Sequence, residues 1–190
     1  MRPTIIIITG RVAAGKSTLA KWLAQEMKLP LLSKDRIREV LFDRLGWKDR
    51  GWAQELGKAS VDMMFYFANT ELKAGHSIIM DNMFNPVLSV PRFDDLKNRY
   101  NADSIQIICK ANNDLLFERF KARAESGERH PGHGDDVVIK GLWDHLTSEY
   151  SPFLDIGGSV IEIDTTDFEE VDYQEIFDKV RSLILESNIE

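Results

Sequence analysis

The chain has 190 residues, of which 43% are hydrophobic and 29% charged, and this composition predicts one compact domain with a substantial core. A formal net charge of −7 opposes the coverage of many phosphates on a polynucleotide, so a small substrate is favoured over nucleic acid. The sequence holds no run of 18 apolar residues and no leader-like start, and Cys109 is its only cysteine. We therefore expect a cytoplasmic protein without membrane helix, signal peptide or internal disulfide, in which Cys109 is a small buried side chain.

The most informative stretch is residues 10–17, which fit the pattern G-x-x-x-x-G-K-[ST]. The β-branched run at residues 4–9 predicts a buried parallel strand before it, and apolar residues at helical spacing predict a helix from Lys16 onward. Strand, loop and helix in this order suit a phosphate-binding loop, because the glycines let successive N–H groups point inward and the helix N-terminus adds unpaired donors. We expect a nucleoside triphosphate to bind here.

Side-chain chemistry predicts separate roles within this loop. Lys16 is a compact, rotatable cation that would reach the outer phosphates, and the Ser17 hydroxyl would ligate Mg²⁺. The alternative is a tight strand-to-helix turn with an exposed lysine. Under the phosphate-loop interpretation, the residues that hold the nucleotide are Gly10, Val12, Ala13, Ala14, Gly15, Lys16, Ser17 and Thr18.

Apolar patterns along the rest of the chain predict alternating strands and helices. Further strands are expected at residues 31–33, 77–82, 104–109 and 159–164. Among the helices between them, one runs to Gly75, one is entered through Pro91, and one begins at Asp135. With the strand at 4–9, this order predicts an α/β fold with a five-stranded, all-parallel sheet and right-handed crossovers, in one domain over residues 1–190.

Asp35 and Arg38 follow the second predicted strand, three residues apart, so both can face one side from the first turn of a helix. A carboxylate and a guanidinium beside the phosphate loop suit a site that accepts a hydroxyl proton and holds an anionic group on an acceptor. The competing interpretation makes Asp35 a helix N-cap, a role that Ser33 could also fill. Spacing alone leaves the two open.

Asp81 ends the third predicted strand. Parallel strands present their carboxyl ends to the ligand crevice, so Asp81 should lie near the phosphate loop and hold Mg²⁺ directly or through water. A capped local turn is the alternative. Residues 82–86 then read as a loop over the acceptor pocket, with Asn82 beside the substrate.

Arg119 and Arg123 are i, i+4 neighbours on a predicted helix that leads into residues 124–134, a stretch with three glycines, a proline and almost no apolar side chain. We expect this stretch to pack no core and to form a hinged lid, approximately residues 124–135. Its closure would bring these cations and Arg129 onto the transferring phosphoryl group. His130 and His133 are too few ligands for a structural zinc site, so hydrogen bonds to backbone or phosphate are favoured for them.

Taken together, the phosphate loop, Asp35-x-x-Arg38, Asp81, the L-F-E-R-x-x-x-R run at 116–123 and the glycine-rich lid resemble the P-loop kinase group. The likeness is to its bacterial predicted kinases, relatives of the zeta toxins, chloramphenicol phosphotransferase and the kinase domain of phage polynucleotide kinase. It covers nearly the whole chain. It implies a three-layer fold with strand order 2-3-1-4-5 and transfer of the γ-phosphate of ATP to a hydroxyl or phosphate.

The resemblance also implies roles at the acceptor and the lid. Asp35 matches the acid that takes the acceptor proton, and Arg38 matches a residue that grips acceptor anions in the polynucleotide kinases. Arg119 and Arg123 match lid-helix arginines that contact the nucleotide and its phosphates, with Arg129 as the third.

For the nucleotide, the resemblance implies that Thr165 and Thr166 belong to the adenine loop after the last strand. One departure is Ala13-Ala14, which stands where many relatives carry an extra glycine and which we expect to be sterically mild. The other is that no set of residues here identifies the acceptor.

The leading hypothesis is therefore a kinase that uses ATP and Mg²⁺ to phosphorylate a small-molecule hydroxyl. Its catalytic residues would be Lys16, Asp35, Arg119, Arg123 and Arg129. A 5′-hydroxyl polynucleotide kinase is one alternative, suggested by Asp35-x-x-Arg38. A nucleotide-binding regulatory protein without turnover is the other, although mere binding needs neither Asp35 nor the lid arginines.

Overall fold

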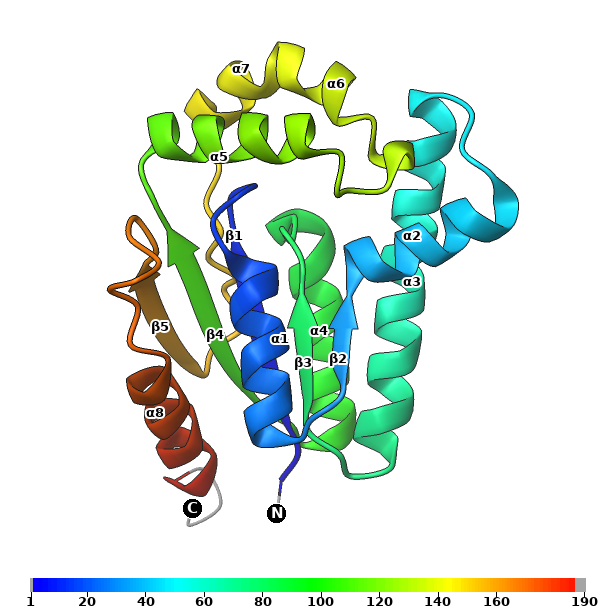
Figure 1. Cartoon of the computed structure of the whole chain (residues 1–190). Helices are drawn as coiled ribbons and strands as arrows, with labels where there is room; N and C mark the ends of the chain where they lie inside the picture. Colours follow the sequence, from blue (N-terminus) through cyan, green and yellow to red (C-terminus); the bar gives the residue numbers. More distant parts are fainter. Residues whose placement is uncertain (1, 187–190) are drawn as a thin grey trace.

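A computed structural model describes residues 2–186 and shows a five-stranded sheet between two layers of helices (Figure 1). The strands are β1 (Thr4–Gly10), β2 (Leu31–Ser33), β3 (Ile78–Asp81), β4 (Asp103–Lys110) and β5 (Ser159–Asp164). All neighbouring pairs are parallel, in the order β2-β3-β1-β4-β5. The predicted fold class and strand order are confirmed.

Helices cover both faces of this sheet. Their bounds are α1 (Lys16–Met27), α2 (Lys34–Leu45), α3 (Arg50–Lys73), α4 (Pro86–Tyr100), α5 (Asn113–Ser126), α6 (Asp135–Val138), α7 (Leu142–Thr147) and α8 (Tyr173–Glu186). Two short 3₁₀ turns, η1 (Pro131–His133) and η2 (Ile139–Gly141), lie among the helices that follow α5. No helix within residues 2–186 has the length and apolarity needed to cross a membrane.

The β-branched run of β1 is buried because the sheet is covered on both sides. Ile5 and Ile7 belong to one apolar cluster, with side chains of α3 and α4. Ile6 and Ile8 belong to the other, with side chains of α1, α5, α7 and α8. Alternate residues of a strand point to opposite faces, so a central strand with two covered faces needs apolar side chains at every position.

The fourth helix begins earlier than the sequence predicted. The Asn85 side chain accepts a hydrogen bond from the Leu88 backbone N–H, and Pro86 occupies the first helical turn, where its missing N–H costs nothing. Pro91 therefore lies inside α4 and does not begin it. Phe84 is fully buried against Phe93, so the segment predicted as an acceptor-side loop contributes partly to the core.

The lid also differs from its prediction in two respects. The helix expected to run on from Asp135 is divided into α6, η2 and α7, and Gly141, between η2 and α7, leaves helical geometry (φ −116°, ψ 11°). The preceding stretch was expected to pack no core, but Gly132 and His133 are buried, with Phe42 of α2 against them.

Candidate active site

The loop between β1 and α1 has the backbone geometry of a phosphate cradle. Gly15, at the N-cap of α1, has φ 77°, and Ala13 takes φ 61° without being glycine. Gly10 passes so close to β4 that a Cβ would lie 2.3 Å from the Cys109 carbonyl oxygen. Lys16 Nζ donates to the Arg11 carbonyl oxygen at 2.6 Å, and burial lowers its pKa. An ammonium with no carboxylate partner among residues 2–186 is available to a phosphate.

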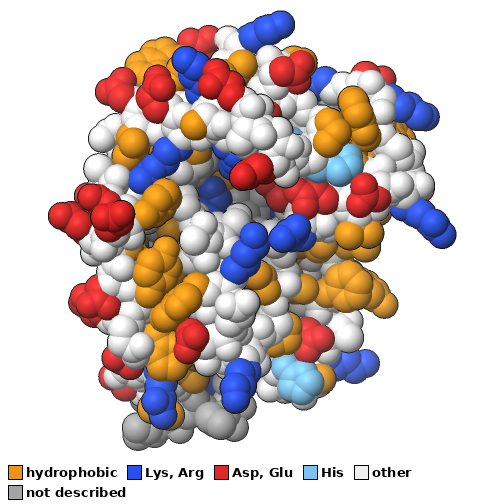
Figure 2. Space-filling view, viewed as in Figure 1, with side chains coloured by type: hydrophobic (Ala, Val, Ile, Leu, Met, Phe, Trp, Pro, Cys, Tyr) orange, Lys and Arg blue, Asp and Glu red, His pale blue; other side chains and the backbone are white. Residues whose placement is uncertain are grey.

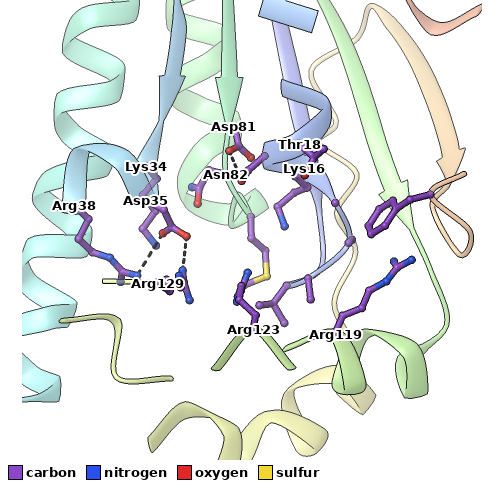
Figure 3. Close-up of a pocket in the computed structure, with 17 residues that line it drawn as sticks. Lys16, Thr18, Lys34, Asp35, Arg38, Asp81, Asn82, Arg119, Arg123 and Arg129 are labelled. Carbon is purple, nitrogen blue, oxygen red and sulfur yellow. Dashed lines mark hydrogen bonds and ion pairs between the residues drawn. The ribbon is translucent and has the colours of Figure 1, made fainter. Parts of the chain in front are cut away.

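A cavity of about 450 Å³ opens at the carboxyl ends of the strands, between this loop, α2 and the lid (Figure 3). Figure 2 shows the corresponding hollow in the surface, with basic side chains at its back. The predicted site residues that line the cavity are Val12, Ala13, Ala14, Gly15, Lys16, Ser17, Thr18, Asp35, Arg38, Asp81, Asn82, Arg119, Arg123 and Arg129. Gly10, Thr165 and Thr166 do not line it.

Asp81 lies beside the first turn of α1. The Ser17 hydroxyl donates to Asp81 Oδ2 at 2.8 Å, and the Ser33 hydroxyl donates to the same oxygen at 3.1 Å. Burial raises the pKa of Asp81, and the neighbouring Lys16 ammonium opposes that rise. Because Mg²⁺ prefers hydroxyl, carboxylate and phosphate oxygens, the Ser17–Asp81 pair is a donor set that fits this ion next to a bound phosphate.

Asp35 lies in the first turn of α2, and its N-cap interpretation is wrong because Ser33 occupies that position. Arg129 Nη2 lies 2.5 Å from Asp35 Oδ2, and Arg38 Nη2 lies 3.4 Å from Oδ1. Burial by itself would raise the pKa of Asp35, but Arg129 and Arg38 outweigh it and hold that pKa well below its ordinary value. The carboxylate is therefore ionised and has a cation on each oxygen.

The cavity has a strong surplus of positive charge in a chain whose net charge is −7. Asp35 and Asp81 are the carboxylates on its wall. The cations that line it are Lys16, Lys34, Arg38, Arg119, Arg123 and Arg129. Lys34 was not predicted as a site residue, although its position between the end of β2 and Asp35 indicates that it lies at the carboxyl edge of the sheet. Such a wall suits a ligand with several negative charges.

On the β5 side, Phe168 is a lining residue that sequence reasoning also missed. The Arg119 guanidinium lies over its ring, 3.8 Å from the centroid, and Nη2 of Arg119 donates to the Thr166 carbonyl oxygen at 2.9 Å. The ring is in close contact with Gly15, where a Cβ would lie 2.4 Å from Phe168 Cε1. A flat group could stack here beside the phosphate loop.

Thr165 lies behind the loop. It is 3% exposed, and its hydroxyl lies 3.1 Å from the Ala14 carbonyl oxygen and 2.9 Å from that of Lys110. These contacts tie the phosphate loop to the end of β4. In residues 2–186, Thr165 and Thr166 thus support the loop and Arg119, and Phe168 reaches the cavity itself.

Two of the three arginines, Arg123 and Arg129, contact one acidic residue at the start of α6. Arg129 Nη1 lies 2.7 Å from Asp135 Oδ1, and Arg123 Nε lies 3.9 Å from Asp135 Oδ2. Arg123 Nε and Nη2 have no hydrogen-bond partner within residues 2–186, although both atoms are buried. Buried donors without partners are costly, so this guanidinium is positioned for a ligand oxygen.

Comparison with known proteins agrees with this geometry. Residues 5–145 match a family model described as an AAA domain. A predicted kinase from Chloroflexus aurantiacus is 37% identical, with 97% of each chain covered and a TM-score of 0.86. Two more distant structures share the fold: shikimate kinase from Bacteroides thetaiotaomicron (18% identity, 95% of this chain and 98% of that one, TM-score 0.50) and a gluconokinase from Sinorhizobium meliloti (13% identity, 97% and 93%, TM-score 0.52). No curated protein matches the chain.

Proposed function

The chain belongs to the AAA domain family AAA_33, and we propose that it is a kinase that uses ATP and Mg²⁺ to phosphorylate a hydroxyl of a small molecule. The observation that carries the proposal is a single cavity with two chemical halves (Figure 3). One half is the phosphate loop with Lys16, and the other is the Asp35 carboxylate with Arg38. Phosphoryl transfer needs both a held triphosphate and an oriented nucleophile.

The nucleotide half is supported by the donors that face it. Backbone N–H groups of residues 12–18 and the N-terminus of α1 would bind the phosphates, and Lys16 would reach the outer ones. Arg119 and Phe168 would hold the base by stacking. Ser17 and Asp81 would hold Mg²⁺, which when bound neutralises charge on the β- and γ-phosphates.

The acceptor half is supported by Asp35 and the cations beside it. The acceptor oxygen would form its bond to the γ-phosphorus as the bond from that phosphorus to the ADP oxygen breaks, and Asp35 would take the hydroxyl proton. Arg38 Nε is buried and has no partner within residues 2–186, so it would bind an anionic or strongly polar group of the acceptor, with Asn82 nearby. Arg123 would stabilise the charge on the transferred group.

The contact between Arg129 and Asp35 bears on this mechanism. A carboxylate with a guanidinium on each oxygen is a weak base. We infer that Arg129 exchanges Asp35 for an oxygen of the transferring phosphoryl group when both substrates are bound, while its contact with Asp135 is kept.

The test is transfer of labelled γ-phosphate from ATP into a pool of hydroxylated metabolites, followed by mass identification of the labelled product. Asp35→Asn should bind ATP with unchanged affinity and lose transfer by about 100-fold or more. Asp95→Asn, on the exposed face of α4, is the matched control. Unimpaired transfer in Asp35→Asn would show that Asp35 is not the base.

The positively charged cavity wall around Asp35 and Arg38 favours a second candidate acceptor, the 5′-hydroxyl of a polynucleotide. Transfer to an oligonucleotide should then fall steeply with ionic strength, because each neutralised phosphate releases counterions. A small acceptor with one anionic group should give a far shallower salt dependence.

A further inference from the structure

The lid packs against α2 through a cluster of aromatic rings. Phe42 of α2 is 1% exposed and stacks on His130 of the lid, with ring centroids 5.2 Å apart and an interplanar angle of 18°. The His133 ring meets the same phenyl ring edge-on at 5.6 Å. The backbone of Gly132 passes over Phe42 so closely that a Cβ would lie 2.6 to 2.9 Å from the ring carbons. Glycine is what allows this contact.

His133 connects the lid to the charged residues of α2. Its side chain is 1% exposed, and its two ring nitrogens have partners on α2. Nδ1 contacts Nη2 of Arg38, and Nε2 lies 3.1 Å from Glu39 Oε1. Burial, with the nearby cation of Arg129, lowers the pKa of His133 to about 3, so the ring is neutral. The partners then fix the tautomer: Arg38 donates to Nδ1, and the Nε2–H donates to Glu39.

The restrained residue is Arg38, and it lies next to the proposed base. Its Nη2 also contacts Asp35 Oδ1 at 3.4 Å, and its guanidinium lies over the Phe42 ring at 5.5 Å. An arginine side chain has several rotatable bonds, so a single contact to Asp35 would not define its direction. The hydrogen bond to His133 of the lid adds a second polar contact, which fixes the direction of the guanidinium.

We propose that His133 is a positioning residue that holds Arg38 against Asp35 in the acceptor half of the site, and that the Gly132–Phe42 contact seats it. The proposal rests on the proposed function for its meaning, but its geometry can be measured in the protein alone. It links two segments that are 94 or more residues apart in the sequence, the lid and the first turns of α2.

The contact between Gly132 and Phe42 is tested with Gly132→Ala, because Gly132 has a φ that L-residues adopt and the three atoms nearest to an added Cβ are all carbons of the Phe42 ring. Hydrogen exchange of residues 128–138 in the unliganded full chain should accelerate by about tenfold or more. Gly141→Ala, at the end of η2 beyond the lid and with nothing within 4 Å of its Cβ, should leave exchange unchanged. In a Phe42→Ala background, Gly132→Ala should have no further effect. Exchange like that of the parent chain in Gly132→Ala would overturn the proposed seat.

The positioning role is tested on the guanidinium itself. Nitrogen-detected NMR of the parent chain should show restricted, resolved Nη signals for Arg38, assigned by their loss in Arg38→Lys. His133→Leu should collapse these signals while those of Arg99, paired with Asp95 on α4, stay unchanged. His133→Asn should retain them, because Asn Oδ1 can accept where Nδ1 does. Unchanged Arg38 signals in His133→Leu would overturn the role.

The two proposals fail separately. If the parent chain transfers no phosphoryl group to any acceptor but Arg38 is released in His133→Leu, the kinase function is wrong and the contact stands. If transfer occurs and His133→Leu leaves both Arg38 and the acceptor KM unchanged, the positioning role is wrong and the kinase function stands.

Discussion

Arg129 of the lid and Asp35 of α2 form an ion pair at 2.5 Å in the wall of the cavity. The pair joins the residue expected to neutralise the transferred group to the residue expected to take the acceptor proton. Under the proposed mechanism, each of the two side chains therefore occupies the place beside the other that a substrate group would take.

Removal of the Arg129 charge should change the pH dependence of transfer. Arg129 lowers the pKa of Asp35, so Arg129→Gln should raise that pKa and move the acidic limb of the kcat/KM profile to higher pH. The maximal rate should also fall by about 100-fold or more, because a phosphoryl-facing arginine is lost. An acidic limb at its original pH would show that Asp35 does not titrate in that limb.

Asp81→Asn should weaken Mg²⁺ binding. The variant retains an oxygen for the Ser17 hydroxyl but removes the negative charge, so the Mg²⁺ concentration for half-maximal turnover should rise by about tenfold or more. Asp62→Asn, on the exposed surface of α3, is the control. A Mg²⁺ titration of ATP turnover gives the comparison, and coincident curves would remove Asp81 from the ion site.

Phe168→Ala should raise the KM for ATP by about tenfold, with a smaller change in kcat, because base stacking contributes roughly 1–3 kcal/mol. The ring lies under Arg119 and against Gly15, so its loss also frees the guanidinium. Phe153→Ala, an exposed aromatic away from the cavity, should change neither constant. Equal kinetics for the two variants would place the base elsewhere.

Ala13→Gly should stabilise the protein. The left-handed φ of 61° costs an L-residue about 1 kcal/mol, and glycine avoids that cost. The midpoint temperature of thermal unfolding should rise by roughly 2–4 °C, which is the shift that about 1 kcal/mol produces in a chain of this length. Ala14→Gly is the matched control: Ala14 is 1% exposed with ordinary φ, so that variant should be less stable. The replacement of the relatives' extra glycine by Ala13-Ala14 was expected to be sterically mild, and this experiment measures the backbone strain at Ala13.

Acidification should weaken the docking of the lid on α2. The pKa of His133 is lowered to about 3 in the docked lid, so the released lid binds the extra proton between pH 6.5 and about 3. The contribution of His133 to docking is therefore fully present above pH 6.5 and declines as the pH falls through this window. The facing groups Arg38 and Arg129 add to the effect by repelling the imidazolium, and Glu39 and Asp35 oppose it. Hydrogen exchange of the lid at pH 7 and pH 5 measures the change, which His133→Asn should abolish.

Local sequence determined the phosphate loop and the sheet around it. The run at residues 4–9, the glycines at 10 and 15 and the lysine at 16 act through backbone geometry and their nearest neighbours, so strand, loop and helix could be predicted together. The strand-end position of Asp81 followed from the rule that parallel strands end at one edge.

The start of α4 was missed even though its signal is local. Asn85 is a favourable N-cap residue and Pro86 a favourable first helical residue, but Pro91 was predicted as the helix start. The packing of Phe84 against Phe93, which brings the preceding loop into the core, depends on tertiary structure.

Tertiary structure alone decided what the lid and the last loop do. The glycine-poor, charged helix α2 gives no sign that Phe42 will receive Gly132, and Phe168 looks like any aromatic in an acidic loop. These contacts join segments that are distant in the sequence and whose own patterns favour solvent. Their energy exists only after the sheet has brought the segments together, so sequence could supply the phosphate loop and the candidate base, and the fold supplied their neighbours.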